Sequence, residues 1–581
     1  MIYSKPKHVS DFKIVLLFSL FSFHQLFYIP KIGTWWDEPY NVLAGKLTVA
    51  KLKYLLFGIE TKEYISDFSD HEFFGMFYQL QTYLFTKLSR FYQEFDLDYL
   101  NIRNELHFSY FLRHIYLHIY ICVLLYIIYY LLKELQSEKF AFIYVVFLIL
   151  IPTINGYSLF DDKDLPYGLH LFISFLLYFY FVKNFDKSNL KHLLPLTGLA
   201  FGTLLLIRFN GTVFLIISII SINIFFLKNL LNKKFIFNNL IIAGYALTVF
   251  LLGTIQGMSD YYKYLKNLYW QQFKVSTWFG ETIVNGETFE RSGDFTYIFK
   301  IFLYKLPIVY LLSILCLIFF YKKIIDNLLL LSTFTFLTIF FIAFIIFKPA
   351  AYNYERQYIF LFFFINLLVV FCIDFISSKT IQIIILSFFV FFTIYSQYGL
   401  EQYKYTYLNE LVDEDSISTI EKGCFENGDC GTWSTDHLSI SGLGLADMAI
   451  KSQLPVFSCS PYQTVSLFNV KNSYINLNNN FVFESGKDVM DYTTLQTSVN
   501  DVKPTSTIFT NREQFSDYLS ENNIKAFSII SEHHIQSTGN VCINKLKSQN
   551  SFKCVLVDEN FVKLRNTKIT INYLLKCDLD F

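Results

Sequence analysis

The feature that most constrains this chain is a series of long apolar runs, each bounded by charged residues. Runs that approach twenty residues fit the roughly 30 Å hydrocarbon core of a bilayer when they are helical. Eleven such runs are recognisable, at 14–29, 108–132, 140–154, 169–182, 193–207, 213–227, 240–255, 301–320, 328–347, 358–376 and 381–395. The sequence therefore predicts a polytopic α-helical membrane protein with about 11 transmembrane helices.

Composition excludes a water-soluble protein with one core. Of the 581 residues, 53% are hydrophobic and only 17% are charged, against about 25% charged in soluble domains. The formal net charge is zero and no basic tract stands out, so we expect no nucleic-acid partner. The first run ends in Ile29-Pro30-Lys31 without a small-residue cleavage site, which favours a retained helix over a removed signal peptide.

The distribution of lysine predicts one orientation. Lys5, Lys7 and Lys13 precede the first run, and the positive-inside rule places such an end in the cytoplasm. Every second turn is then also lysine-rich, with Lys133, Lys139, Lys183, Lys187, Lys191, Lys228, Lys233, Lys234, Lys322, Lys323 and Lys379. The polar stretches that remain are all expected on the outer face: 37–38, 161–166, 256–300, 352–358 and everything after 395.

This topology predicts two parts. Residues 1–396 are expected to form a transmembrane core with outer-face loops at 31–107 and 256–300. Residues 397–581 are expected to form an extracytoplasmic C-terminal domain, because apolar runs give way there to Asn, Ser and Asp. A strand at 505–510, a helix at 512–523 and a strand at 526–530 predict a small α/β unit.

Cysteine usage agrees with an outward-facing tail. Three cysteines lie in apolar runs, and the tail holds the other six: Cys424, Cys430, Cys459, Cys542, Cys554 and Cys577. An even, clustered set in an oxidising compartment favours disulfides. Zinc binding is the alternative, but the sequence has no Cys-x-x-Cys pair.

The stretch Thr34-Trp35-Trp36-Asp37-Glu38-Pro39-Tyr40 follows the first run closely. Tryptophan belongs at the membrane–water interface, and carboxylates held at that depth usually have a function. Asp37 and Glu38 are therefore candidate catalytic residues. An ordinary solvated loop is the alternative.

A second acidic cluster, Asp161-Asp162-Lys163-Asp164, lies on the same expected face. The alternative is a polar turn that caps the following helix. With two clusters on one face, one carboxylate can take a proton from an attacking hydroxyl while others hold a divalent metal ion. A further candidate metal cluster is Asp70-His71-Glu72, in which His71 and Glu72 are the ligands we would test; solvated side chains are the alternative there.

Positive charge is expected at the same boundary, from Arg113, Arg208, Arg356 and Lys305. Basic side chains at a membrane boundary often only reach toward lipid headgroups. Arginine also suits a leaving phosphate, because its planar fork donates two hydrogen bonds at once. Acids for a nucleophile and arginines for a phosphate together suggest group transfer from a lipid phosphate.

Several blocks resemble the membrane-embedded C-type glycosyltransferases, in particular the protein O-mannosyltransferase and aminoarabinose-transferase branch with its bacterial relatives. The resemblance covers most of residues 1 to about 450. The blocks are Trp36-Asp37-Glu38, Arg113-His114, Pro152 to Pro166, Gly198 to Gly211, Asn285-Gly286-Glu287 to Pro307, Tyr354-Glu355-Arg356-Gln357-Tyr358 and Tyr405 to Leu411.

The resemblance implies an inverting glycosyltransferase that moves a hexosyl or pentosyl group from a polyprenyl-phosphate-linked donor to an acceptor hydroxyl. By position, Asp37 corresponds to the base with Glu38 beside it, Asp162 and Asp164 correspond to the second acidic motif, and Arg356 corresponds to a residue that holds the donor phosphate. Arg113 and Arg208 are further candidates for the donor phosphate because they are expected at the same boundary, and Lys163 belongs to the acidic cluster. It implies a protein, lipid or glycan acceptor, contact with membrane lipid, and a bacterial inner membrane with the site facing outward. The chain departs from the pattern at Gln357, where many relatives have His, and at Leu408, where Phe is usual.

The alternative from another class is a polytopic transporter or flippase. It predicts ionisable residues near the middle of several spans and two related halves. Within the runs, the Asp, Glu, Lys and Arg residues are Arg113 and Lys305 near expected outer ends and Asp374 near an inner end, and no internal repeat is evident. An inactive scaffold that presents the tail is a third hypothesis.

Overall fold

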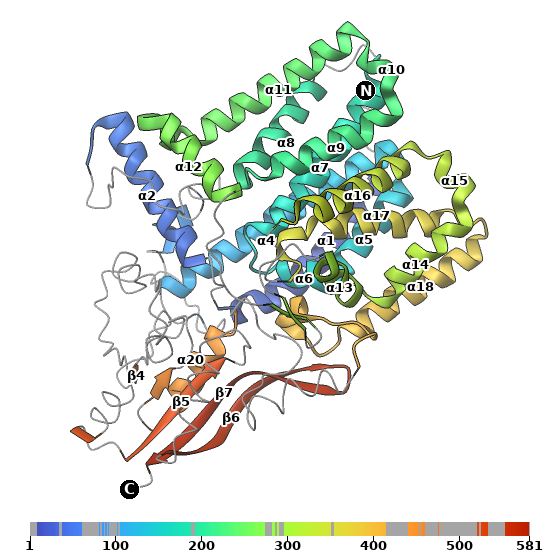
Figure 1. Ribbon diagram of the computed structural model, residues 1–581. Coiled ribbons are helices and arrows are strands. Elements are labelled where there is room, and N and C mark those ends of the chain that lie inside the picture. Colours follow the sequence, from blue (N-terminus) through green and yellow to red (C-terminus); the bar gives the residue numbers. More distant parts are fainter. Residues whose placement is uncertain are drawn as a thin grey trace.

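The computed structural model describes residues 8–33, 38–60, 102, 105–186, 192–273, 282–284, 287–289, 295–349, 354–413, 440–452, 456–458, 474–475, 525–532 and 552–579, with shorter pieces at 81, 84–85, 87–89, 91, 454 and 520–521. A bundle of helices fills the upper part of Figure 1, and a C-terminal sheet lies below it. The elements up to the middle of the bundle are α1 (His8–Tyr28), η1 (Ile29–Lys31), α2 (Glu38–Phe57), α4 (Glu105–Leu135), α5 (Glu138–Leu150), α6 (Pro152–Tyr157), α7 (Asp164–Asn184), α8 (Leu193–Ile207), α9 (Gly211–Asn223), η5 (Ile224–Phe226), α10 (Leu227–Leu230) and α11 (Lys233–Gly253).

The remaining elements of the bundle are η6 (Ile255–Asp260), α12 (Tyr261–Phe273), β1 (Thr282–Val284), β2 (Glu287–Phe289), α13 (Phe295–Lys305), α14 (Ile308–Cys316), η7 (Leu317–Phe320), α15 (Tyr321–Ile325), α16 (Leu328–Phe347), η8 (Arg356–Tyr358), α17 (Phe360–Asp374), α18 (Lys379–Ser396) and η9 (Glu401–Thr406). Strands β1 and β2 form a small antiparallel hairpin. The sequence had predicted the stretch 256–300 only as a loop, so η6, α12 and this hairpin are additions.

All eleven predicted runs are helical, and the chain is a multi-pass membrane protein. Eight helical segments in the described part are long and apolar enough to cross a membrane: Phe12–Lys31, His107–Leu135, Asp164–Asn184, Gly211–Leu230, Lys233–Gly253, Ile308–Ile325, Leu328–Phe347 and Lys379–Ser396. The other three predicted spans correspond to α5, with 13 residues, and to α8 and α17, with 15 each. These are shorter than the 17–25 residues usual for a span, so the count of about eleven stays a prediction.

One predicted span has a different start. The run at 301–320 was expected to be continuous, but α13 ends at Lys305 and α14 begins at Ile308, with Pro307 at the N-cap of the second helix. Proline has no N–H to donate and disfavours a helical conformation in the residue before it. The break leaves Lys305 at the end of a separate helix beside the bundle.

Small residues allow helices to approach closely in this bundle. Gly198 and Gly202 are four residues apart on α8, and a methyl group added to either would lie within 2.8 Å of an α11 carbonyl, that of Ile242 or of Ala246. This small-xxx-small spacing is typical of membrane helix pairs, in which close packing replaces the hydrophobic effect. The sequence therefore specifies the α8–α11 pair directly.

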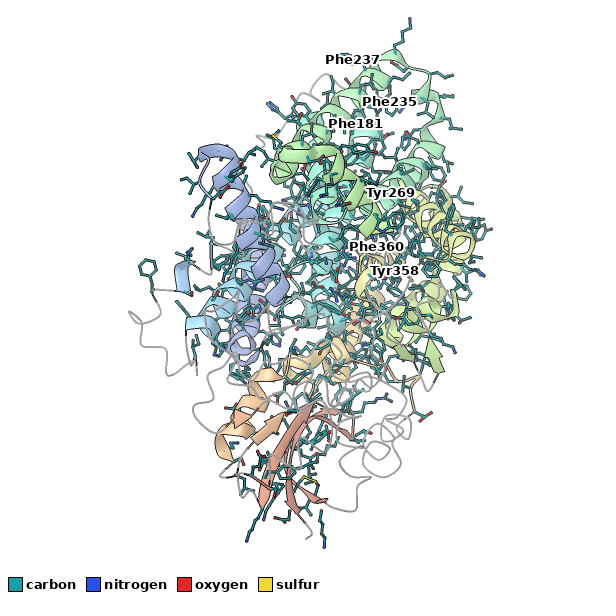
Figure 2. The ribbon with its side chains drawn as sticks, turned by 60° about the vertical axis from the view of Figure 1, so that its left-hand side comes forward. Phe181, Phe235, Phe237, Tyr269, Tyr358 and Phe360 are labelled. Carbon is teal, nitrogen blue, oxygen red and sulfur yellow. A yellow bond between two sulfur atoms is a disulfide. The ribbon has the colours of Figure 1, made fainter. Side chains whose placement is uncertain are left out.

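Aromatic residues fill the rest of the interior. Every residue of α17 from Phe360 to Ile373 is buried. Phe181 of α7 and Phe235 of α11 stack with ring centroids 5.6 Å apart, whereas Phe237 is 63% exposed and faces outward (Figure 2). Offset aromatic pairs of this kind are favourable beyond the area that they bury.

Polar contacts lie at two opposite ends of the bundle. At one end, Lys139 donates to Gln382, and the Lys323 ammonium donates to the Phe375 carbonyl at 2.5 Å. The two lysines belong to turns that were expected in the cytoplasm. The acids and arginines predicted for the outer face meet at the other end, which we call the site end.

The tail forms a five-stranded sheet with strand order β4-β3-β5-β7-β6. Its strands are β3 (Val456–Ser458), β4 (Tyr474–Ile475), β5 (Ala526–Glu532), β6 (Phe552–Leu564) and β7 (Thr567–Leu579), and the helix α20 (Gly442–Lys451) contacts β5 and β7. β3 is parallel to β4 and β5, and the β5–β7 and β6–β7 pairs are antiparallel. The predicted strand at 526–530 is confirmed as β5, and the segments 505–510 and most of 512–523 lie outside the described residues.

A disulfide joins Cys554 and Cys577 across β6 and β7. Disulfide bonding in the tail is thus confirmed for this pair. The other four tail cysteines, Cys424, Cys430, Cys459 and Cys542, lie outside the described residues. The domain boundary at 396/397 stays a prediction.

The turn of the β6–β7 hairpin lies against the site end of the bundle. Arg565 has a left-handed backbone conformation and donates from Nη2 to the carbonyls of Asn409, at 2.9 Å, and Val412, at 2.8 Å. The Lys563 N–H donates to the Gly399 carbonyl at 3.2 Å. The tail is therefore bonded to the segment that follows the last helix.

Candidate active site

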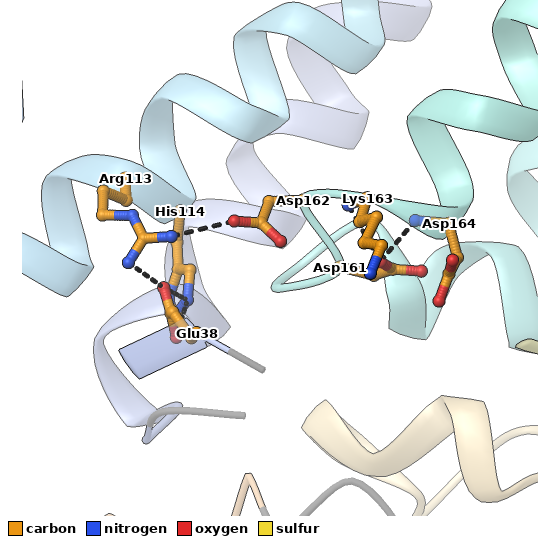
Figure 3. Close-up of polar contacts among 7 residues, drawn as sticks. All are labelled: Glu38, Arg113, His114, Asp161, Asp162, Lys163 and Asp164. Carbon is orange, nitrogen blue, oxygen red and sulfur yellow. Dashed lines mark hydrogen bonds and ion pairs between the residues drawn. The ribbon is translucent and has the colours of Figure 1, made fainter. Parts of the chain in front are cut away.

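The loop between α6 and α7 carries three aspartates with different partners (Figure 3). Asp161 accepts backbone N–H groups from Lys163 at 3.1 Å, Asp164 at 2.8 Å and Leu165 at 3.1 Å. The first N–H groups of a helix have no partner within the helix, and the helix dipole favours a negative charge beside them. Asp161 thus caps α7, as the capping alternative predicted, and the chain is turned so that Asp162 and Asp164 reach other partners.

Asp161 is also electrostatically unusual. Burial raises the pKa of its carboxyl to about 7, while Arg356 and the N–H of Lys163 lower it. A buried carboxyl that is only 1% exposed has lost the water that would solvate its charge. Its charge therefore changes near neutral pH.

The first ion-pair group joins α2, α4 and the loop. The Arg113 guanidinium lies 3.2 Å from Glu38 Oε1 and 2.8 Å from Asp162 Oδ2, and it lies over the Tyr110 ring. His114 Nε2 is 3.2 Å from the same Glu38 oxygen. Glu38, Arg113 and His114 are at most 6% exposed. Arg113 therefore connects the loop to the start of α2, although the two are far apart in sequence.

The second ion-pair group surrounds Asp164 at the start of α7. Arg208, at the C-cap of α8, bonds to one carboxylate oxygen, and Arg356, at the start of η8, bonds to the other. Asp164 is 1% exposed, and the arginines are 12% and 8% exposed. All three predicted arginines thus lie within one array with the predicted acids. Lys163 lies between the two groups in the loop (Figure 3).

A pocket with an empty volume of about 380 Å³, part of it open to solvent, adjoins the first group. Its lining is Glu38, Gln81, Phe85, Arg113, His114, Tyr116, Leu117, Tyr120 and Asp162. The charged residues of the lining are Glu38, Arg113 and Asp162. Its aromatic and apolar residues are Phe85, Tyr116, Leu117 and Tyr120, which we call the aromatic wall. Small-molecule sites likewise combine an apolar lining with a few polar groups.

The aromatic wall was missed from sequence, although a signal for it exists. Residues 113, 114, 116, 117 and 120 have the spacing of one helical face, so α4 presents Tyr116 and Tyr120 below Arg113. Tyr120 in turn contacts His170 Nε2 of α7 at 2.5 Å. Its hydroxyl is therefore held at the pocket by a second helix.

Three predicted site residues, Asp37, His71 and Glu72, lie outside the described residues. In the described part, no three His, Cys, Asp or Glu side chains meet in a group that could hold a metal ion. The carboxylates of Glu38, Asp162 and Asp164 are each neutralised by arginine. This donor set does not fit a divalent cation, and no step below uses one.

No protein-family model matches the sequence, and no match to a curated protein is significant. The structure is similar to two crystal structures of ArnT from Cupriavidus metallidurans, one bound to undecaprenyl phosphate and one in the apo state. Each has 10% sequence identity and covers 97% of both chains, with TM-scores of 0.45 and 0.47 respectively. The sequence blocks resemble the branch that contains both protein O-mannosyltransferases and aminoarabinose transferases.

Proposed function

We propose that the protein is a glycosyltransferase of the membrane that moves a sugar from a polyprenyl-phosphate donor to an acceptor hydroxyl. The observation that carries the proposal is the array at the site end, where three arginines and three carboxylates surround one loop beside a pocket of about 380 Å³. Charged side chains buried within a membrane bundle are rare and are usually functional. This array brings together residues from five segments of the chain.

The pocket suits a donor with a charged head and an apolar remainder. Arg113 stands at its charged wall, and Leu117 and Tyr120 follow at one and nearly two helical turns further along α4. A guanidinium has five N–H donors, so an arginine in an ion pair can still donate a hydrogen bond to a phosphate oxygen. Arg208 and Arg356 supply further positive charge around the loop.

The proposed reaction is a direct displacement at the anomeric carbon. The acceptor oxygen forms a bond to that carbon, the bond between the carbon and the phosphate oxygen breaks, and the acceptor proton goes to a carboxylate. The polyprenyl phosphate leaves with the bonding electrons, and arginine stabilises its added negative charge. Displacement from the opposite face inverts the configuration.

Glu38 is poorly suited to be the base, because its carboxylate is held by Arg113 and His114. We assign it a positioning role at the start of α2. Asp37, its neighbour in the chain, is then the proposed base. The acceptor is a hydroxyl of a protein, lipid or glycan, and the site is proposed to face outward from a bacterial inner membrane.

The test is the Asp37→Asn variant, with Asp260→Asn as the matched control. Asp260 is an exposed aspartate at the end of η6, and it accepts the backbone N–H of Lys263 at 3.0 Å. Loss of a general base typically costs about 10²–10⁴-fold in rate. We expect Asp37→Asn to lose sugar transfer to that extent while remaining inserted, and Asp260→Asn to transfer at the wild-type rate. Full activity of Asp37→Asn would rule out the base assignment.

A further inference from the structure

A further buried ion pair lies next to the arginine array. Lys305 Nζ, at the end of α13, is 3.8 Å from Glu355 Oε2, and the two side chains are 3% and 0% exposed. The same ammonium donates to the Tyr405 carbonyl at 2.8 Å and lies over the Tyr354 ring. Lys305 therefore contacts both the turn before α17 and the segment η9.

From the sequence, Lys305 was expected at the membrane boundary as a source of positive charge for a phosphate. Its burial and its partners do not support that role. Removing two charges from water is costly, and an apolar pair of the same volume is often as stable. Burial also raises the pKa of Glu355, with the Lys305 ammonium opposing that rise. Since such a pair contributes little to stability, we explain its presence by the backbone that it holds in place.

The pair holds the turn that carries Arg356. Glu355 and Arg356 are consecutive, and Glu355 faces Lys305 while Arg356 Nε bonds to Asp164. The preceding residue, Tyr354, has φ of 56°, a left-handed conformation that is unfavourable for a bulky side chain. Such a conformation persists only where its surroundings fix it. The Tyr297 hydroxyl does so in part, by donating to the Tyr354 carbonyl at 3.2 Å.

We propose that the Lys305–Glu355 pair is a positioning device: it fixes the turn at 354–356 so that the Arg356 guanidinium stays on Asp164 and beside the phosphate of the donor. The part that concerns the phosphate rests on the proposed function. Neither Lys305 nor Glu355 touches the reacting atoms. Both act through the backbone that they share with Arg356.

The variants are chosen to separate position from folding. The double variant Lys305→Met/Glu355→Gln removes both charges at nearly constant volume, so that no single charge is left buried. Lys305→Arg keeps the charge and is the conservative rescue. Lys404→Met is the matched control, because Lys404 is also a buried lysine at the site end, but its ammonium contacts His24 at 2.7 Å and Asn155 at 3.3 Å instead.

Two measurements on the purified full chain test the proposal. The first is hydrogen exchange of the peptide over 354–358, which includes the Tyr358 N–H bonded to the Glu355 carbonyl at 2.9 Å. The second is binding of a radiolabelled polyprenyl phosphate without sugar. In the double variant we expect faster exchange in this peptide but not in α8, and binding weakened about tenfold or more, because small misplacements are costly. Lys305→Arg and Lys404→Met should match wild type in both.

The possible failures are distinguishable. Wild-type exchange and binding in the double variant, with weakened binding in Arg356→Gln, would overturn the positioning role and leave the proposed function intact. Wild-type binding in Arg356→Gln would instead count against the phosphate role of that arginine. Exchange at 354–358 would then still decide whether the pair positions the turn. Faster exchange throughout the molecule would indicate a general loss of stability and overturn the proposal.

Discussion

Asp161, Asp162 and Asp164 stand within four residues of one another, and their environments give them different chemistry. Asp161 accepts three backbone N–H groups, Asp162 bonds to Arg113, and Asp164 bonds to two other arginines. The sequence alone predicted one acidic cluster and did not assign a separate role to each aspartate. The separation of roles comes from the arginines, which approach from helices that the sequence does not place relative to the loop.

Asp161 leads to a prediction about pH. An aspartate in the unfolded chain titrates near 3.9, and burial raises the pKa in the folded protein to about 7. An acid whose pKa is higher in the folded than in the unfolded protein contributes its full stabilisation below the unfolded pKa. That stabilisation is lost as the pH rises through the folded pKa. We therefore expect the wild type to become less stable relative to Asp161→Asn as the pH rises from about 4 to about 7. Thermal unfolding of both proteins in detergent at several pH values measures this difference. Asp260→Asn should keep the wild-type dependence, and the same slope in Asp161→Asn would contradict the assignment.

At the scale of elements, the short helix α6 and the segment η9 are packed with almost no space between them. A methyl group added at Gly156 would lie 2.3 Å from the backbone nitrogen of Tyr405. The Tyr157 and Tyr405 rings meet edge to face beside this contact. The acidic loop follows directly after α6, so the α6–η9 contact helps to position that loop, and Gly156 matters for the site although it has no chemistry of its own.

We expect Gly156→Ala to destabilise the fold by about 1–3 kcal/mol, the usual cost of overpacking. Gly244→Ala is the control, because a methyl group there meets nothing within 4 Å. That change should be neutral or stabilise by up to about 1 kcal/mol, since alanine is the better helix former. Thermal midpoints of the two purified variants give the comparison, and equal midpoints would show that the close approach is not required.

The hairpin β6–β7 gives a second prediction at this scale. Its turn residue Arg565 donates hydrogen bonds to the bundle, at the carbonyls of Asn409 and Val412. Asn409 itself donates to the carbonyls of Leu303 and Leu306 at 2.6 Å each, at the end of α13. The hairpin is thus connected to α13 through a single asparagine.

Replacing Arg565 by alanine should weaken this docking by about 1.5–3 kcal/mol, the contribution typical of a hydrogen bond to a charged group. Hydrogen exchange should then increase in the peptide 399–412 but not in β7. Lys576→Ala is the control, because Lys576 is 44% exposed and 3.7 Å from Asp578, an arrangement that contributes little. Unchanged exchange in Arg565→Ala would show that the tail is held elsewhere.

At the scale of the whole molecule, the order and lengths of the helices were largely predictable, because a bilayer fixes how long an apolar run must be. The spacing of Gly198 and Gly202 on α8 is a local signal for close helix packing, and the lysine-rich turns are a local signal for orientation. Three features were not predicted. Pro307 divides a run that hydropathy joins, Lys305 is buried and not at a surface, and the Tyr116–Tyr120 wall depends on which face of α4 is covered. The break at Pro307 follows from the chemistry of proline itself, which hydropathy does not take into account. The burial of Lys305 and the covered face of α4 depend on packing between distant segments.

The convergence of the site follows from that packing. Glu38, Arg113, Asp164, Arg208 and Arg356 belong to five segments, and they meet at one end of the bundle. The sequence predicted that these residues share a face, on the basis of lysine distribution alone. Their ion pairs agree with that topology, while the compartment that they face stays a prediction.

The central claim is that this array serves transfer of a sugar from a lipid phosphate. The most direct measurement incubates membranes that contain wild type or Asp37→Asn with a panel of radiolabelled polyprenyl-phosphate sugars and follows the label of each. The account predicts that wild type consumes at least one donor, releases polyprenyl phosphate and moves the label to an acceptor, and that Asp37→Asn leaves every donor intact. Consumption of no donor by wild type, or equal consumption by both proteins, would contradict it.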